Sequence, residues 1–232
     1  MPPFALLRKG GTDMERENKI MSIAQAIGHI QNEDRIMVGG FGLRGGPDAI
    51  VDALIETDLK DLTIISNDLG SPHIGLGKLL DRHMIKTCIG SFYNWNRDLI
   101  AAYNSGEVAV TLIPQGTFIE AIRAAAYGIP AFYTPTAYGT ILAEGHETRL
   151  FGGRGCILQE AIGADVALIK AKRADRLGNL EFHKTARNFN PTMAMAATYT
   201  IALVDEIVAI GALDPEDIQV PHIYVNAIVQ EE

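Results

Sequence analysis

The sequence of 232 residues is poor in cysteine and in basic charge, and it has no long apolar run. Cys88 and Cys156 are too few for a disulfide scaffold and indicate reduced thiols in the core of a cytoplasmic protein. A formal net charge of -8 repels phosphate backbones, so we expect no nucleic-acid partner. No segment approaches the roughly 20 apolar residues that cross a bilayer, so we expect no membrane partner.

Signatures of several enzyme classes are also missing. The six histidines show no metal-ligand spacing, and the His146-Glu147 pair lacks the second histidine of the zinc-protease motif. The sequence has no Gly-x-Ser-x-Gly elbow and no Walker loop. We therefore expect no metal site.

The first 18 residues differ from the rest of the chain. They carry acids and lack the apolar core of a signal peptide, so we interpret residues 1–18 as a loose N-terminal arm. The remainder has no repeat, low-complexity tract or flexible linker, which predicts a single domain over residues 19–232.

Short apolar strands alternate with helical patterns through the first half of the chain. The strands are continuous apolar runs, which is typical of strands buried on both faces of a parallel sheet. This alternation predicts an α/β fold, an open and mostly parallel sheet flanked by helices. We expect strands at 36–38, 62–66, 85–89 and 108–113, and helices at 20–30, 47–57, 74–81, 95–103 and 116–128.

After residue 131 the alternation loosens. Residues 148–160, with a Gly-Gly-Arg-Gly centre, predict a hairpin, and residues 176–182 predict a second tight turn. The fold should therefore carry a small antiparallel annex. We expect further strands at 164–171, 200–206 and 222–229, and a helix that Asn190-Pro191 opens and that runs through residues 193–199.

The stretch VGGFGLRGGP, residues 38–47, has five glycines and follows a predicted strand. It contains G-x-G-x-x-G, which would suit a dinucleotide-binding dehydrogenase, but Pro47 would then fall inside the helix and disrupt it. We favour Pro47 as the first residue of the helix. The loop from Gly39 to Gly46 is then a glycine-lined floor that offers bare N–H groups to a ligand. The alternative is a tight turn that only needs positive φ.

Residues 32–47, NEDRIMVGGFGLRGGP, resemble the signature of the α (A) subunit of family I coenzyme A transferases of the 3-oxoacid type. Glu33 departs from that signature, where glycine or asparagine is usual. The likeness continues through TIISND, LIPQGTFIEAIRAAAYG and ARNFNP, and it covers nearly everything from Lys19 to Val225. The residues that match the glycine-rich part of the signature are Gly39, Gly40, Phe41, Gly45 and Pro47.

The resemblance implies a ping-pong transfer of CoA between an acyl-CoA and a short 3-oxo acid such as acetoacetate. A glutamate carboxylate attacks the thioester and forms an acyl anhydride, and the released CoA thiolate then gives a glutamyl-CoA thioester. The donor would be succinyl-, acetyl- or butyryl-CoA, and 3-oxoadipate is the alternative acceptor. The CoA thioester is a substrate, and no permanently bound cofactor is implied.

The family nucleophile lies in a Ser-Glu-Asn-Gly stretch of the β (B) subunit, and this chain has no such stretch. Glu144 in LAEG is the nearest imitation, and we do not expect it to be the nucleophile. The resemblance thus implies half of an enzyme, whose β subunit carries the catalytic glutamate in a cytoplasmic heterotetramer.

The resemblance also assigns residues of the site. Gln115 follows a predicted strand and is implied as an oxyanion-hole donor, although alone it would read as a turn residue facing water. Asn67 has an Asx turn as its alternative, and Phe41 a place in the core. A binding module that takes acyl-CoA or a nucleotide without transfer remains a rival function. The residues expected to bind substrate or CoA are Gly39, Gly40, Phe41, Gly42, Gly45, Asn67 and Asp68.

Overall fold

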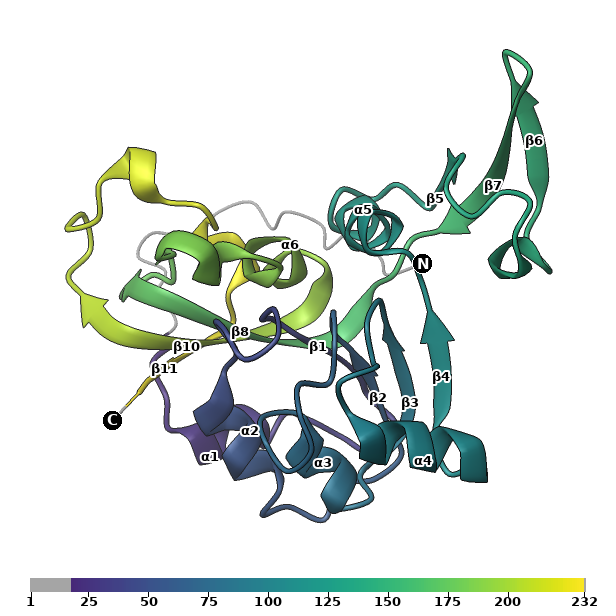
Figure 1. Cartoon of the computed structure of the whole chain (residues 1–232). Helices are drawn as coiled ribbons and strands as arrows, with labels where there is room; N and C mark the ends of the chain where they lie inside the picture. The colour runs from purple at the N-terminus through teal and green to yellow at the C-terminus, as the bar shows by residue number, and fades with distance from the viewer. Residues whose placement is uncertain (1–17, 232) are drawn as a thin grey trace.

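The computed structural model describes residues 18–231, so the expected arm lies outside the described residues except for Asn18. An eight-stranded sheet runs through the molecule (Figure 1) in the order β11-β10-β8-β1-β2-β3-β4. All neighbours along this path are parallel, and a short β9 pairs antiparallel with β8. The strands are β1 Arg35–Val38, β2 Leu62–Ile65, β3 Ile85–Gly90, β4 Ala109–Leu112, β8 Ala164–Asp175, β9 Leu180–Glu181, β10 Ala197–Val208 and β11 Ala227–Gln230.

Helices cover both faces of this sheet (Figure 1). Successive strand residues alternate between two apolar layers, so that Ile36 and Val38 belong to one layer and Met37 to the other. No helix within residues 18–231 is long and apolar enough to cross a membrane. One face carries α1 Ile23–Ile27, α2 Asp48–Leu54, α3 Gly77–Asp81 and α4 Arg97–Ser105, and the other carries α5 Gln115–Ala126 and α6 Asn190–Ala194.

The predicted antiparallel annex is present as a separate three-stranded sheet. It consists of β5 (Ala131–Thr134), β7 (Arg154–Glu160) and β6 (Thr148–Phe151) in that order, with both pairings antiparallel. Figure 1 shows it projecting beyond α5, away from the large sheet. The predicted fold class, an open and mostly parallel sheet with helices and a small annex, is confirmed.

Two elements near the C-terminus differ from expectation. The helix that begins at Asn190-Pro191 ends at Ala194, because Ala197 already pairs with Ala164 of β8 and starts β10. The expected strand at 222–229 is a 3-10 turn, His222–Tyr224, followed by β11. In both places an apolar composition suited helix and strand alike, and pairing with β8 or β10 decided the outcome.

Pro47 stands immediately before α2, one residue earlier than expected. Asp48 then occupies the first turn, near the positive end of the helix dipole. The conclusion that the proline marks the start of the helix holds, and with it the longer glycine loop.

Two asparagines after the 3-10 turn η2 (Lys184–Arg187) attach this loop to the rest of the fold. The Asn190 amide donates to the carbonyl oxygens of Gly45 and Ala186, both at 2.9 Å, and its Oδ1 accepts from the N–H of Lys170 at 3.0 Å. A Cβ at Gly39 would lie 1.8 Å from this Oδ1. The side chain of Asn190 therefore fills the space that the absence of a Cβ at Gly39 leaves.

We predict that Gly39→Ala destabilises the chain by about 1–3 kcal/mol, since the new methyl group must displace the Asn190 side chain, which is held by four hydrogen bonds. Gly116→Ala is the matched control, because its Cβ meets nothing within 4 Å and alanine raises helix propensity by up to about 1 kcal/mol. Urea unfolding of both variants measures the difference. Equal stability of the two variants would contradict this packing argument.

Cys88 in β3 and Cys156 in β7 are both buried free cysteines, so the expectation of core thiols is confirmed, and Cys88 has no exposed surface at all. Burial raises the pKa of Cys88 to about 12. In the unfolded chain the thiol loses its proton near pH 8.5. Above that pH the unfolded state binds fewer protons than the folded state, and the free energy of unfolding falls as pH rises.

We expect the stability difference between the unmodified chain and Cys88→Ala to shrink by about 2 kcal/mol from pH 8 to pH 10, because one proton contributes about 1.4 kcal/mol per pH unit. Denaturant titrations at the two pH values measure it, and all other titrating groups cancel in the comparison. A difference that does not change with pH would contradict the assignment.

Candidate active site at the carboxyl ends of β1 to β4

Four consecutive parallel neighbours, β1, β2, β3 and β4, end at the same edge of the sheet. The chain leaves them through the glycine loop, residues 66–70, residues 91–96 and residues 113–115, respectively. Ligands of open α/β sheets bind outside such carboxyl ends. The register therefore brings Asn67 and Asp68, which follow β2, together with Gln115, which follows β4, beside the glycine loop.

The glycine loop closes on itself. Phe41 and Arg44 exchange two main-chain hydrogen bonds, at 3.0 and 3.2 Å, around a turn in which Gly42 has φ +57°. The N–H of Gly39 donates to the carbonyl of Leu168 at 2.9 Å. The expected row of bare N–H donors is thus wrong for Gly39, Phe41 and Arg44, whose N–H groups the loop and β8 already satisfy.

Side chains from other segments satisfy two further N–H groups. Gly40 donates to Oδ1 of Asn188 at 3.1 Å, and Gly42 donates to Oδ2 of Asp68 at 2.8 Å. A Cβ at Gly45, where φ is +72°, would meet the amide nitrogen of Asn188 at 2.9 Å. The glycines therefore allow this loop to pack tightly against its own protein. Asn188 and Asn190 therefore join the loop to the segment before α6: Asn188 bonds to Gly40 and Arg44 of the loop and Asn190 to Gly45, while both also bond to residues outside the loop.

Asp68 is buried, and protein donors engage both of its oxygens. Oδ2 accepts from Gly42 N–H and from the amide of Asn67, each at 2.8 Å, and Oδ1 accepts from Gly70 N–H at 2.9 Å. The side chain joins the glycine loop to the end of β2. Its contact with Gly70 is the local turn bond typical of aspartate, and its other two contacts reach beyond that turn.

Asn67 is also buried and links Asp68 to the opposite side of the site. Its Oδ1 accepts from Nε2 of Gln115 and from the hydroxyl of Ser91, both at 3.3 Å. The expected alternative of a plain Asx turn does not describe Asn67, because its side chain bonds to three side chains. Gln115 itself is exposed and is the first residue of α5, directly after Pro114.

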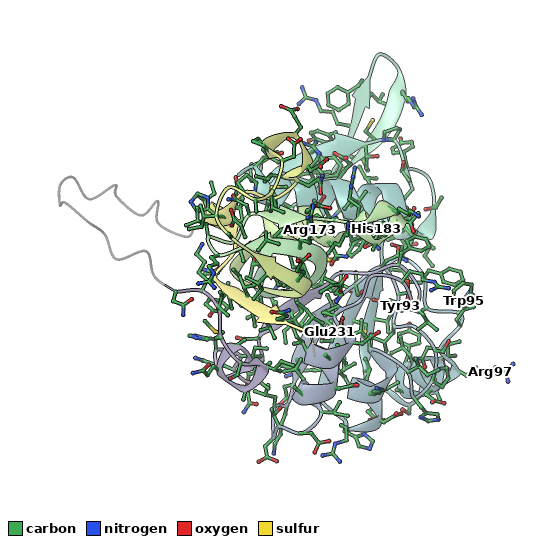
Figure 2. The ribbon with its side chains drawn as sticks, turned by 90° about the vertical axis from the view of Figure 1, so that its left-hand side faces the viewer. Tyr93, Trp95, Arg97, Arg173, His183 and Glu231 are labelled. Atoms are coloured by element: carbon green, nitrogen blue, oxygen red, sulfur yellow. The ribbon has the colours of Figure 1, made fainter. Side chains whose placement is uncertain are left out.

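These residues line an open groove of about 330 Å³. Phe41 is 49% exposed and stacks on Phe189 at a centroid distance of 6.5 Å, so it does not fill the core as its alternative interpretation proposed. Trp95 and Phe92 meet edge to face at 5.1 Å, and the Trp95 ring lies at the outer edge of the molecule (Figure 2). The groove is lined by Phe41, Asn67, Asp68, Ser91, Phe92, Trp95 and Gln115.

Sequence reasoning missed Phe92 and Trp95 as groove residues. We had placed Trp95 inside the helix at 95–103, but α4 begins at Arg97, because the Asn96 side chain caps it by accepting from Leu99 N–H at 3.1 Å. An asparagine before a helical pattern is a common N-cap. Asn96 is therefore the sequence signal that would have placed Phe92 and Trp95 in the loop before the helix.

Two titratable groups near the glycine loop and the groove have raised pKa values. Burial raises the pKa of Tyr93 well above its usual value, with smaller contributions from Cys88 and Asp68. Asp48 lines a smaller hollow beside the glycine loop, where partial desolvation of its carboxyl group, and then the charge of Asp52, raise its pKa. Neither Tyr93 nor Asp48 lines the groove itself.

The transfer reaction that the resemblance implies needs a carboxylate in the groove that is free to attack a thioester. Of the seven lining residues only Asp68 is acidic, and its oxygens are engaged by Gly42, Asn67 and Gly70. Glu144 is an exposed residue at the end of the 3-10 turn Ile141–Ala143 and does not line the groove. The described part of the chain therefore offers this groove no free carboxylate.

One cluster on the described surface has a composition that could hold a metal ion. His73, Asp81 and Asp98 bring ligand atoms within 4.8 Å of one another. The hydrogen bond to Asp81 raises the pKa of His73, so the group forms ion pairs without a metal. None of the three residues lines the groove.

Two sequence relatives cover almost the whole chain. The A subunit of a succinyl-CoA:3-ketoacid coenzyme A transferase from Helicobacter pylori is 46% identical over 216 residues, which is 93% of this chain and 93% of the relative. The A subunit of a 3-oxoadipate CoA-transferase from Pseudomonas putida is 47% identical over 210 residues, which is 90% of this chain and 91% of the relative.

A solved structure with the same fold is an acyl-CoA transferase from E. coli O157:H7, described as a thioester complex with CoA. It superposes with a TM-score of 0.83 at 19% identity, over 93% of this chain and 48% of that chain. Residues 20–231 match the family model described as coenzyme A transferase. The chain therefore belongs to the coenzyme A transferase family.

Proposed function

We propose that this chain is the α (A) subunit of a 3-oxoacid CoA-transferase whose catalytic glutamate lies on a partner β (B) subunit. The observation that carries the proposal is a groove at the strand ends with no free carboxylate of its own, in a family that transfers CoA. The relatives at 46% and 47% identity are themselves named as A subunits, which supports a partner for this chain. The acyl-CoA transferase that shares this fold is a longer chain, and this chain covers 48% of it. The remaining part of that chain has no counterpart here, as expected if a second subunit supplies it.

The proposed reaction balances at each step. The partner's carboxylate attacks the thioester carbonyl, the CoA thiolate leaves, and an acyl anhydride remains. The thiolate then attacks the glutamyl carbonyl and releases the acid, which leaves CoA on the glutamate as a thioester. The 3-oxo acid attacks this thioester, the thiolate leaves again and attacks the acyl carbonyl of the new anhydride, and the product departs as acyl-CoA.

Gln115 is the donor that we assign to the carbonyl oxygen in these additions. It is exposed to the groove, and its uncharged amide can donate to a developing oxyanion without neutralising the attacking carboxylate. Phe41, Phe92 and Trp95 offer an apolar rim for the arm of CoA. Asn67 and Asp68 line the groove between these two parts. Gly39, Gly40, Gly42 and Gly45 do not line it, and we assign them to binding only as the loop that carries Phe41 into the groove.

The 3-oxo acid is a short one such as acetoacetate, with succinyl-, acetyl- or butyryl-CoA as donor. The relative named for 3-oxoadipate, at 47% identity, makes that dicarboxylate the second candidate. No lining residue of the groove is cationic, so a distal carboxylate would need its counter-charge from the partner. A rate comparison of acetoacetate with 3-oxoadipate on the assembled enzyme decides between the two.

Large apolar side chains on the exposed surface fit a permanent partner. Trp95 is 63% exposed, and Ile141, in the 3-10 turn between β5 and β6, is 77% exposed. Leu112 lies on β4, the strand at the edge of the large sheet, and is 49% exposed. We propose an assembly of two α and two β subunits, a heterotetramer.

We expect this chain alone to transfer no CoA, and transfer to occur after it is mixed with a β subunit that carries Ser-Glu-Asn-Gly. Borohydride reduction of the enzyme incubated with acyl-CoA should modify the partner's glutamate and no residue of this chain, as read by peptide mass. Transfer by this chain alone would refute the division of labour. Acyl-CoA binding by the pair without transfer would support the rival binding module.

We predict that Gln115→Ala lowers kcat of the pair by about 100-fold, which corresponds to the loss of one oxyanion donor worth about 3 kcal/mol. KM for the 3-oxo acid should change much less, because the lost bond forms mainly in the transition state. Gln31→Ala is the control, since Gln31 is exposed and lies outside the groove. A kcat equal to that of the control would contradict the assigned role.

A further inference from the structure

We propose that Asp68 is a positioning residue that fixes, through Asn67, which end of the Gln115 amide meets the reacting carbonyl. The proposal rests on the role given to Gln115 above and adds what holds that glutamine in its working orientation. It follows from a chain of hydrogen bonds that runs from the glycine loop across the ends of β2 and β3 to the first turn of α5.

This series of hydrogen bonds begins at Oδ2 of Asp68, an atom that can only accept. A carboxylate oxygen has no hydrogen to donate. Main-chain N–H groups of Gly42 and Gly70 hold the two oxygens of Asp68 from both sides, at 2.8 and 2.9 Å. The side chain is buried, so solvent does not compete for it. Oδ2 therefore lies at a fixed place and requires a donor from Asn67.

This requirement orients Asn67. Its amide must turn Nδ2 towards Asp68, which is the observed contact at 2.8 Å. Oδ1 then faces the opposite way, where Gln115 and Ser91 reach it. An amide oxygen also only accepts, so Gln115 must present Nε2 and not Oε1. The orientation of one buried carboxylate thus passes through two amides.

The orientation of Gln115 matters for the reaction. One of the two N–H bonds of Nε2 is used by Asn67, and the second remains for the carbonyl oxygen of the substrate. In the flipped state Oε1 would take this place and repel the negative charge that develops in the additions. A freely rotating amide would occupy that unproductive state for part of the time.

Asp68→Asn tests the relay with little change in shape. The asparagine has one donor end, so it must give up its bond with either Gly70 or Gly42. If the asparagine gives up Gly70, its oxygen still accepts from Gly42 and Asn67, and the relay is intact. If it gives up Gly42, its amide nitrogen faces Asn67, and Asn67 turns Oδ1 towards it and Nδ2 towards Gln115. Gln115 then presents Oε1, which is the unproductive orientation.

The experiment is a double-mutant cycle on the assembled enzyme, with kcat as the readout. Because each orientation of the asparagine gives up one hydrogen bond, we expect Asp68→Asn to lower kcat at least about twofold in the otherwise unchanged enzyme. In a Gln115→Ala background the same substitution should leave kcat unchanged, a non-additivity typical of groups that act as a unit. KM for the 3-oxo acid should change less than kcat. Asp48→Asn, at the loop but outside the network, should give the same factor in both backgrounds.

A rescue variant separates positioning from folding. In Asn67→Asp/Asp68→Asn an acceptor-only carboxylate again faces Gln115, so kcat should rise above that of Asp68→Asn alone. If Asp68 only supports the fold, kcat of the double variant should be lower than that of Asp68→Asn alone, because the second substitution disturbs the same buried place again. The comparison is made on variants with equal assembly by size-exclusion chromatography.

The possible failures point to different parts of the scheme. If Gln115→Ala leaves kcat unchanged, the donor role falls and the relay falls with it. If Gln115→Ala lowers kcat but Asp68→Asn has the same factor in both backgrounds, the proposed function stands and the relay is overturned. A rescue variant slower than Asp68→Asn also overturns the relay.

Discussion

The parallel alignment of β1 to β4 is the constraint on which the rest of the site depends. Parallel neighbours deliver the chain to one edge of the sheet, so four loops with no sequence proximity must share the same small space. Such loops bring unpaired main-chain groups with them, and each buried one needs a partner. The polar side chains at this edge meet that need first: Asp68 serves Gly42 and Gly70, and Asn188 serves Gly40.

The elements that the sequence predicted are those whose signals are local. Continuous apolar runs predicted the strands of the parallel sheet, and Pro47 placed the start of α2 to within one residue. The Gly-Gly-Arg-Gly centre predicted the hairpin of the annex. These features depend on local chemistry. The end of α6 at Ala194 was not predictable in this way, because the competing strand gains its stability from pairing with β8.

The site was predictable only in part, for the same reason. The resemblance picked out Asn67, Asp68 and Gln115, and the structure places them side by side. It could not reveal that Asn190 packs against Gly39 from a distant part of the sequence, nor that N–H groups of the loop are already bonded. A glycine-rich sequence has the same appearance whether the missing side chains make room for a ligand or for the protein itself. Only the long-range contacts distinguish the two.

The electrostatic character of the groove then follows from its hydrogen bonds. A carboxylate nucleophile from a partner would be repelled by a free acid on this wall, yet Asp68 lies in it. Three donors to its oxygens reduce that repulsion, because the N–H dipoles of Gly42, Gly70 and Asn67 direct their positive ends at the charge. A second amide in its place could not accept from all three donors at once. A buried aspartate is thus compatible with an incoming carboxylate, and it gives the neighbouring amides a single orientation.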